Sequence, residues 1–289
     1  MNILVTGSNG QLGNEMRVLS ALHAQHRFFF TDVEELDITN IEAIEQFVTS
    51  NNINCIVNCA AYTNVDRAEE DEPTAFLINA TAVSNLGKVA ATHNLLLVHI
   101  STDYVFNGKA FKPYKESDPT DPQTAYGRTK LKGEQLLHQV CPQAVVIRTA
   151  WLYSSFGNNF VKTMLRLGKE KDQLNVVFDQ IGSPTYAADL AWAIMLVVNH
   201  PPQGQHLIFH FTNEGVCSWY DFTKEIHRIA NINCNVMPIL SEQYTYKTPR
   251  PHYSVLDKQK FKTTFSVQIP HWQVALKACM DKLKENAES

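Results

Sequence analysis

The stretch Asn2-Ile-Leu-Val-Thr6, followed directly by Gly7-Ser-Asn-Gly10-Gln-Leu-Gly13, decides the fold of this chain. The apolar run predicts a short buried strand, and the apolar residues beyond the glycines repeat at helical spacing. Glycines between a strand and a helix let the backbone turn tightly and approach a pyrophosphate, which then lies on the free N–H groups of the helix N-terminus. We therefore expect a dinucleotide-binding turn at Gly7, Gly10 and Gly13.

A second strand is predicted at residues 28–32, and it ends in Asp32. This carboxylate lies about twenty residues past the last glycine, where an acidic side chain can accept the ribose hydroxyls of the cofactor. Taken alone, Asp32 reads equally well as a surface turn residue. The preceding strand, glycine turn and helix favour the cofactor role.

Further apolar runs alternate with helical patterns along the first half of the chain, at residues 55–60, 96–101 and 145–150. Strands that alternate with helices imply right-handed crossovers and a parallel sheet covered on both faces. We predict an α/β protein with a Rossmann-like doubly wound parallel sheet. Residues 1–150 would form the dinucleotide-binding domain and residues 151–289 mainly a smaller C-terminal substrate-binding domain, with residues 176–200 returning to the sheet.

The amino-acid composition limits the kinds of binding partner to expect. The 289 residues include 25 basic and 29 acidic side chains, a net charge of −4, and no Lys/Arg run, so we expect neither nucleic acid nor a membrane as partner. Six scattered cysteines are read as reduced thiols without metal-ligand spacing. No secretory segment or long apolar stretch is visible, and we expect a cytoplasmic protein that acts on a small molecule.

The residues with catalytic potential are Ser101-Thr102-Asp103, at the end of a predicted strand, and Tyr126-Gly-Arg-Thr-Lys130. Side chains four residues apart share one face of a helix. An ammonium beside a phenol is expected to stabilise the phenolate and lower its pKa from about 10, which would make Tyr126 a usable proton donor. On its own this spacing is usually a solvated pair, but the glycine turn favours catalysis.

Taken together, these residues resemble the extended short-chain dehydrogenase/reductase superfamily and, within it, the dTDP-4-dehydrorhamnose reductase family. The finer matches extend nearly end to end: Asn58-Cys-Ala-Ala-Tyr-Thr-Asn-Val-Asp66, Ser101-Thr-Asp-Tyr-Val-Phe106, Tyr126-Gly-Arg-Thr-Lys-Leu131, Arg148-Thr-Ala-Trp151, Gly157-Asn-Asn-Phe160 with Thr163-Met-Leu, and Arg250-Pro251. The resemblance implies reduction of the 4-keto group of a dTDP sugar to dTDP-L-rhamnose with NADH or NADPH, in nucleotide-sugar and cell-surface polysaccharide biosynthesis.

The resemblance also implies roles for individual residues. The catalytic set would be Thr102, Tyr126 and Lys130. The cofactor contacts, which also include Tyr126 and Lys130, would be Gly7, Gly10, Gln11, Leu12, Gly13, Asp32, Asp37, Ile38, Ala61, Tyr62 and Thr63. The sugar-nucleotide contacts would be Thr102, Asp103, Tyr104, Trp151 and Arg250.

Two further expectations concern the cofactor and a metal. Asp32 should repel the extra phosphate of NADPH, and residues 33–38 hold no arginine to offset this, so NADH is favoured. Some relatives dimerise through acidic side chains around magnesium. Glu15 matches one such position, but Asp189 stands where relatives carry a glutamate pair. We assign no metal ligand, and leave magnesium and a homodimer open.

Three other functions are compatible with this fold. Related sugar-nucleotide dehydratases place a glutamate after the aspartate, and that glutamate is the base for elimination. This chain has Tyr104 at that position, so the elimination base is missing. An epimerase would retain NAD through an internal redox cycle, which the sequence does not exclude. A regulatory subunit related to that of methionine adenosyltransferase would bind without turnover, although the intact Thr102, Tyr126 and Lys130 favour catalysis.

Overall fold

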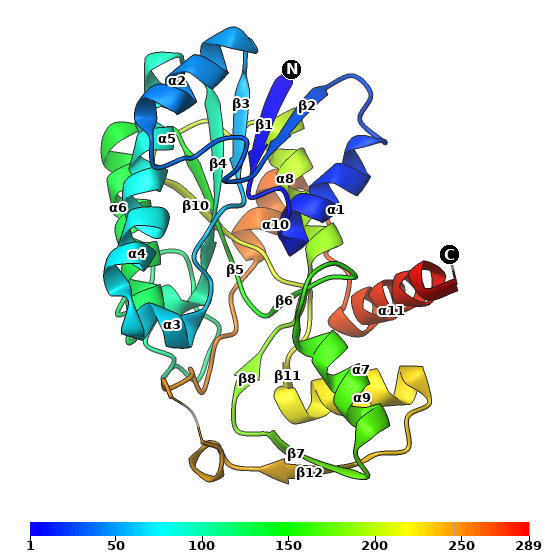
Figure 1. Cartoon of the computed structure of the whole chain (residues 1–289). Helices are drawn as coiled ribbons and strands as arrows, with labels where there is room; N and C mark the ends of the chain where they lie inside the picture. The colour runs from blue at the N-terminus through cyan, green and yellow to red at the C-terminus, as the bar shows by residue number, and fades with distance from the viewer. Residues whose placement is uncertain (246, 289) are drawn as a thin grey trace.

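The computed structural model describes residues 1–245 and 247–288. Within that part of the chain, six parallel strands form one sheet (Figure 1). Their spatial order is β10 (Leu207–His210), β5 (Val145–Thr149), β4 (Leu96–Thr102), β3 (Cys55–Asn58), β1 (Asn2–Thr6) and β2 (Arg27–Thr31). The strand order reverses beside β1, and ligands of open parallel sheets bind at such a point, beyond the carboxyl ends of the strands.

Helices cover both faces of the sheet because alternate side chains of each strand point to opposite sides. Ile3 and Val5 of β1 belong to the apolar cluster under α1 (Gln11–Ser20), α8 (Ala187–Asn199) and α10 (Gln259–Phe265). Leu4, between them, belongs to the opposite cluster, under α2 (Ile41–Ser50), α5 (Ala82–Thr92) and α6 (Ala125–Val140). These three strand side chains are fully buried, and each contributes roughly 1.5–3 kcal/mol.

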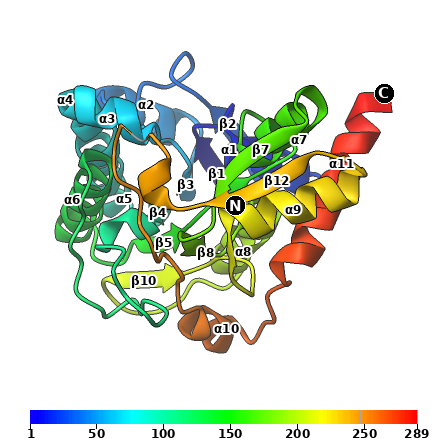
Figure 2. The same cartoon turned by 90° about the horizontal axis from the view of Figure 1, so that it is seen from below.

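The second half of the chain has an apolar core of its own. Three helices build it: α7 (Phe160–Glu170), α9 (Trp219–Ala230) and α11 (Trp272–Glu288). Two of these helices, α7 and α9, lie at the lower end of Figure 1 and face the viewer in Figure 2. Three two-stranded pairs complete the core: β7 (Gln173–Val177) with β12 (Asn235–Ile239), β8 (Ile181–Gly182) with β11 (Cys217–Ser218), and β6 (Leu152–Tyr153) with β9 (Thr185–Tyr186).

Short helices line the path between β3 and α5. These are α3 (Val65–Glu70), α4 (Glu72–Phe76) and a π-helical turn, η1 (Leu77–Thr81), that leads directly into α5. A 3₁₀ turn, η2 (Asp103–Val105), follows β4, and a second one, η3 (Ser241–Gln243), follows β12. The sequence patterns predicted none of these turns.

The predicted fold class, a doubly wound parallel sheet with a smaller C-terminal part, is confirmed. Helix α8 lies in the apolar cluster on one face of the sheet. Strand β10 was not expected, although it extends the sheet beside β5. The division at residue 150 stays a prediction. None of the helices in the described residues is long and apolar enough to cross a membrane.

Candidate active site

A cavity of about 950 Å³ opens at the carboxyl edge of the sheet. The ends of β1, β2, β3, β4 and β5 all contribute to its wall, together with the start of α1 and the first turns of α6. The convergence follows from the parallel topology, since every strand delivers its last residues to the same edge.

At the glycine turn, backbone segments approach so closely that a side chain would not fit. Gly7 has a left-handed backbone, with φ +65°, and a Cβ there would lie 2.6 Å from the backbone of Ala60. A Cβ on Gly13 would lie 2.5 Å from the carbonyl oxygen of Gly7. None of the described side chains caps the N-terminus of α1 at Gly10, so its first N–H groups stay available to a bound anion. This cradle fits the pyrophosphate of a dinucleotide.

Asp32 lies at the end of β2 on the wall of the same cavity, near Asp37 and Ile38. One carboxylate oxygen accepts a hydrogen bond from Asn9 N at 2.9 Å, and the other accepts one from Val33 N at 2.9 Å. A carboxylate oxygen has two acceptor positions, so both oxygens retain capacity for the hydroxyls of a ribose.

Thr102 ends β4, and Tyr126 lies in the first turn of α6, which Thr124 caps by accepting from Gly127 N at 3.1 Å. The Thr102 hydroxyl donates to Asp103 Oδ1 at 2.9 Å and accepts from Tyr104 N at 3.2 Å. These contacts hold the threonine oxygen at the wall of the cavity that Tyr126 also lines.

The expectation that Lys130 lowers the pKa of Tyr126 is wrong for this structure. Burial raises the pKa of Tyr126 to about 12, and hydrogen bonding to Thr102 offsets only part of that rise. Removing a phenolate from water costs more than its neighbours return. Tyr126 is therefore a firmly protonated acid at neutral pH.

Lys130 lies one helical turn further along α6 and is only 1% exposed. Its Nζ donates to the carbonyl oxygen of Ile100 at 2.7 Å and lies 3.4 Å from His99 Nε2. Burial lowers the pKa of Lys130 to about 8, and Glu134 and Cys59 oppose that shift. Burial also raises the pKa of the neighbouring cavity residue Asp103 to about 7.

Two aromatic side chains, Trp151 and Tyr104, line part of the cavity. Trp151, with a left-handed φ of 50°, stacks on Trp219 with ring centroids 3.5 Å apart and planes 6° apart. A Cβ on Gly182 would come within 2.5 Å of the same indole. Trp219 and Gly182 therefore cover part of the Trp151 indole. Tyr104 meets Tyr126 edge to face at 5.4 Å.

The structure brings most of the predicted site residues into this one cavity. Those that line it are Gly7, Gly10, Gln11, Leu12, Gly13, Asp32, Asp37, Ile38, Ala61, Thr63, Thr102, Asp103, Tyr104, Tyr126, Lys130 and Trp151.

Two predicted residues, Tyr62 and Arg250, are not part of that lining in the described chain. Arg250 donates to Asp66 Oδ2 at 2.9 Å, and it lies close enough to Tyr104 to oppose the rise in the pKa of that phenol.

Asn79 supports the site from outside the cavity lining, and the sequence patterns did not predict this role. Its side chain clamps the backbone of Tyr62, accepting from Tyr62 N at 2.9 Å and donating to Tyr62 O at 3.0 Å. It also donates to Thr129 Oγ1 at 3.1 Å, and so ties the 60–63 loop to α6. Asn79 lies in the π-helical turn η1, and such turns occur frequently at functional sites. The one sequence pattern that includes it, Asn79-Ala-Thr81, matches a glycosylation sequon and gives no sign of this role.

The acidic residues considered for magnesium, Glu15 and Asp189, each bond a polar side chain within the described chain. Glu15 accepts from Ser154 and Asp189 from Asn213. Burial raises the pKa of both carboxyls. In the part of the chain that the structure describes, no group of three or more His, Cys, Asp or Glu side chains is placed to hold a metal ion.

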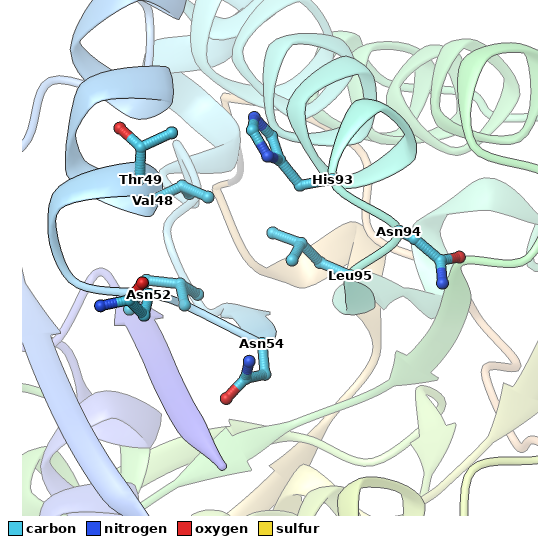
Figure 3. A pocket seen from close by; sticks show the side chains of 8 residues that line it. Val48, Thr49, Asn52, Asn54, His93, Asn94 and Leu95 are labelled. Atoms are coloured by element: carbon cyan, nitrogen blue, oxygen red, sulfur yellow. The ribbon is translucent and has the colours of Figure 1, made fainter.

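A second hollow, of about 400 Å³, lies at the opposite edge of the sheet (Figure 3). Asn54 and Leu95, which line it, directly precede β3 and β4. His93 is the one ionisable side chain in the lining of this hollow, and it is hydrogen-bonded to Glu45. This hollow faces the amino ends of the strands, where ligands of such sheets do not bind.

A doubly wound sheet with a glycine turn, an acidic residue ending β2, and Thr102, Tyr126 and Lys130 together at its carboxyl edge defines an extended short-chain dehydrogenase/reductase. The family model described as "RmlD substrate binding domain" matches residues 1–285. The chain belongs to this family, that of the dTDP-4-dehydrorhamnose reductases.

Three relatives give the degree of similarity. A dTDP-4-dehydrorhamnose reductase from Aggregatibacter actinomycetemcomitans is 39% identical over 95% of this chain and 97% of its own length. A probable dTDP-4,6-dihydroxy-2-methyloxan-3-one 4-ketoreductase from Streptomyces antibioticus is 40% identical over 96% of this chain and 94% of its own. The crystal structure of a dTDP-4-dehydrorhamnose reductase from Bacillus anthracis in complex with NADP is 38% identical and superposes with a TM-score of 0.93, over 97% of this chain and 99% of that one.

Proposed function

We propose that this chain reduces the 4-keto group of dTDP-4-dehydro-L-rhamnose with NAD(P)H and forms dTDP-L-rhamnose. The observation that carries the proposal is the meeting of Thr102, Tyr126 and Lys130 with the glycine turn in one cavity. Full-length similarity to reductases of this name supports the choice of substrate.

The residues divide the chemistry between them. The reduced cofactor, with its pyrophosphate bound at the glycine turn, would supply a hydride from its nicotinamide for the sugar C4. Tyr126 donates a hydrogen bond to the carbonyl oxygen as negative charge grows on it. Thr102 would donate a second one after its hydroxyl turns away from Asp103 Oδ1, to which it donates in the structure. Tyr126 then gives its proton to that oxygen. Because the pKa of Tyr126 is about 12, the phenol keeps its proton until the substrate oxygen becomes strongly basic.

In the proposal, Lys130 binds the cofactor. The lysine lines the cavity while its Nζ donates to Ile100 O, and its remaining N–H groups would bind the ribose of the cofactor. The bond to Ile100 O orders the ammonium before the cofactor binds, which reduces the reorganisation needed for that binding.

We further propose that NADH is the preferred cofactor. The Asp32 carboxylate would accept bonds from the adenosine ribose hydroxyls and repel a phosphate at the same place. The margin is expected to be small, because the Bacillus anthracis relative was crystallised with NADP. Comparing kcat/KM for NADH and NADPH tests this, and a clear preference for NADPH would contradict it.

A second candidate is reduction of a different dTDP-keto sugar. The Streptomyces antibioticus relative is as similar as the rhamnose-forming one, and its name describes a 4-ketoreductase with another substrate. The same residues would serve both reactions, since they contact only the carbonyl and the cofactor. The sugar-facing wall around Trp151 and Tyr104 would decide between the substrates.

The test is a coupled assay with isotopic labelling. The dTDP-4-keto sugar is generated in place by a dehydratase and a 3,5-epimerase, and NADH oxidation is followed spectrophotometrically. Deuterium at C4 of the nicotinamide should appear at C4 of dTDP-L-rhamnose, with one NADH consumed per product. An epimerase would consume no net NADH, and a regulatory subunit would show no turnover. Either result would overturn the proposal, whereas faster turnover of the non-epimerised sugar would support the second candidate.

Two structural parts of the proposal can be tested separately. Residues 151–289 would mainly bind the sugar nucleotide, and crosslinking of a photoreactive dTDP analogue should label that half. The homodimer allowed by the family resemblance would be measured by light scattering with and without EDTA. A monomer under both conditions would exclude it.

A further inference from the structure

A chain of buried polar side chains lies directly behind Lys130. It runs from Thr6 on β1 through Asn58 on β3 and His99 on β4 to Lys130 on α6. All four side chains are at most 1% exposed. The proposed mechanism uses only the last of them.

The amide of Asn58 can be oriented in only one way. Its Oδ1 accepts from Ala60 N at 3.1 Å and from Thr6 Oγ1 at 2.7 Å. A backbone N–H is always a donor, so the atom facing Ala60 must be the oxygen. The Asn58 Nδ2 group therefore faces His99 Nδ1, at 3.0 Å.

This orientation decides the form of the imidazole. Asn58 Nδ2 can only donate, so His99 Nδ1 must accept and carries no proton. The neutral ring then carries its proton on Nε2, which lies 3.4 Å from Lys130 Nζ. An imidazolium would place a donor against Asn58 and a cation beside Lys130. Burial and the lysine charge accordingly hold the pKa of His99 well below its usual value.

The Nε2–H group discriminates between the two forms of Lys130. An amine could donate one N–H to Ile100 O, at 2.7 Å, and accept the His99 N–H with its lone pair. An ammonium has three donors and no lone pair, so one side of it would face another donor. We infer that His99 is a positioning residue for the proposed reduction, a permanently neutral imidazole whose Nε2–H favours the free amine of Lys130. The inference rests on the proposed function only for its catalytic consequence.

Other charged and titratable groups around His99 and Lys130 also affect the protonation of Lys130. Glu134, one turn further along α6, favours the ammonium, but its carboxylate is bound by Arg148 at 2.7 Å. Cys59 also favours the ammonium, and His138 faces His99 from α6. These groups explain why the lowered pKa of Lys130 stays near 8. The active-site ammonium would therefore be the major form at neutral pH but would titrate just above it.

Two substitutions separate the contacts of His99. In His99→Asn, the amide oxygen can still accept from Asn58 in place of Nδ1, but no donor reaches Lys130. In His99→Gln, the longer amide can still present an N–H near the position of Nε2. The matched control is His227→Asn, because His227 is also buried but bonds Met164 O at 3.0 Å in the C-terminal core.

The primary experiment is NMR on the protein without substrate, so that its result does not depend on the proposed reaction. Long-range ¹⁵N correlation should show the Nε2–H tautomer of His99 from pH 6 to 9. The ¹³Cε resonance of Lys130, assigned by its loss in Lys130→Arg, should report the lysine pKa. We expect His99→Asn to raise that pKa by about one unit. His99→Gln should restore most of the shift, and His227→Asn should cause none.

The catalytic consequence is a second readout. If the reduction needs the Lys130 ammonium, the alkaline limb of kcat should move upward in His99→Asn by the same amount as the NMR pKa. An Nδ1–H tautomer, an imidazolium, or an unchanged or lowered Lys130 pKa in His99→Asn would overturn the inference. Failure of the wild-type enzyme to reduce the sugar, with the NMR results as expected, would instead count against the proposed function.

Discussion

Replacing Tyr126 by phenylalanine removes one hydroxyl from the cavity and little else. The ring would keep its edge-to-face contact with Tyr104 and its packing on Ala68, Ala75 and Ala125. At pH 7 a phenol with a pKa of about 12 is ionised in only about one molecule in 10⁵, so the wild-type enzyme always presents the proton. Without it, water must protonate the oxygen, and Thr102 alone stabilises the charge. We expect kcat to fall 10²–10⁴-fold, a loss of roughly 3–5 kcal/mol of transition-state stabilisation.

The assay is NADH oxidation with the dTDP-4-keto sugar generated in place, together with cofactor binding and thermal unfolding of the same variant. The control is Tyr153→Phe, because Tyr153 is buried in the C-terminal core and its hydroxyl has no hydrogen-bond partner among the described residues. That control should keep wild-type turnover. A Tyr126→Phe enzyme within threefold of the wild-type kcat would refute the assignment of Tyr126 as the proton donor.

Three further predictions follow from named contacts. Asp32→Asn keeps an acceptor for Asn9 N but removes the charge, so the NADH-to-NADPH ratio of kcat/KM should fall about tenfold, or 1.4 kcal/mol; an unchanged ratio would show that the carboxylate does not select the cofactor. The pKa of Asp103 is raised to about 7 in the folded protein, so the stability that its bound proton contributes is lost as pH rises through 7. An asparagine at this position does not titrate, so the unfolding free energy of Asp103→Asn should rise by about 2–3 kcal/mol relative to that of the wild type between pH 5 and pH 9. Urea unfolding at both pH values measures this, and a difference that does not change with pH would contradict the raised pKa. Glu134→Ala should lower the unfolding free energy by about 3–5 kcal/mol because it leaves the Arg148 guanidinium buried and unpaired, whereas Glu134→Leu combined with Arg148→Met should cost less; equal losses would contradict that account.

Some of the fold could be predicted because its determinants are local. The strand, glycine turn and helix at residues 2–20 are contiguous, and the alternation of Ile3, Leu4 and Val5 between two faces follows from strand geometry alone. Strand β10 could not be predicted in the same way. Its four residues resemble any short apolar run, and its place beside β5 depends on pairing with a strand about sixty residues earlier.

The sequence by itself determined which chemical groups meet at the carboxyl edge, since parallel strands deliver Gly7, Asp32, Thr102 and the Tyr126 helix to the same place. Only the tertiary structure decided their charge states. The expected lowering of the Tyr126 pKa became a rise because burial outweighs the hydrogen bond with Thr102. The clamp from Asn79 and the imidazole behind Lys130 also came from other elements of the chain. Residue spacing fixes which side chains share a helix face, but desolvation and donor geometry depend on every element that packs around them.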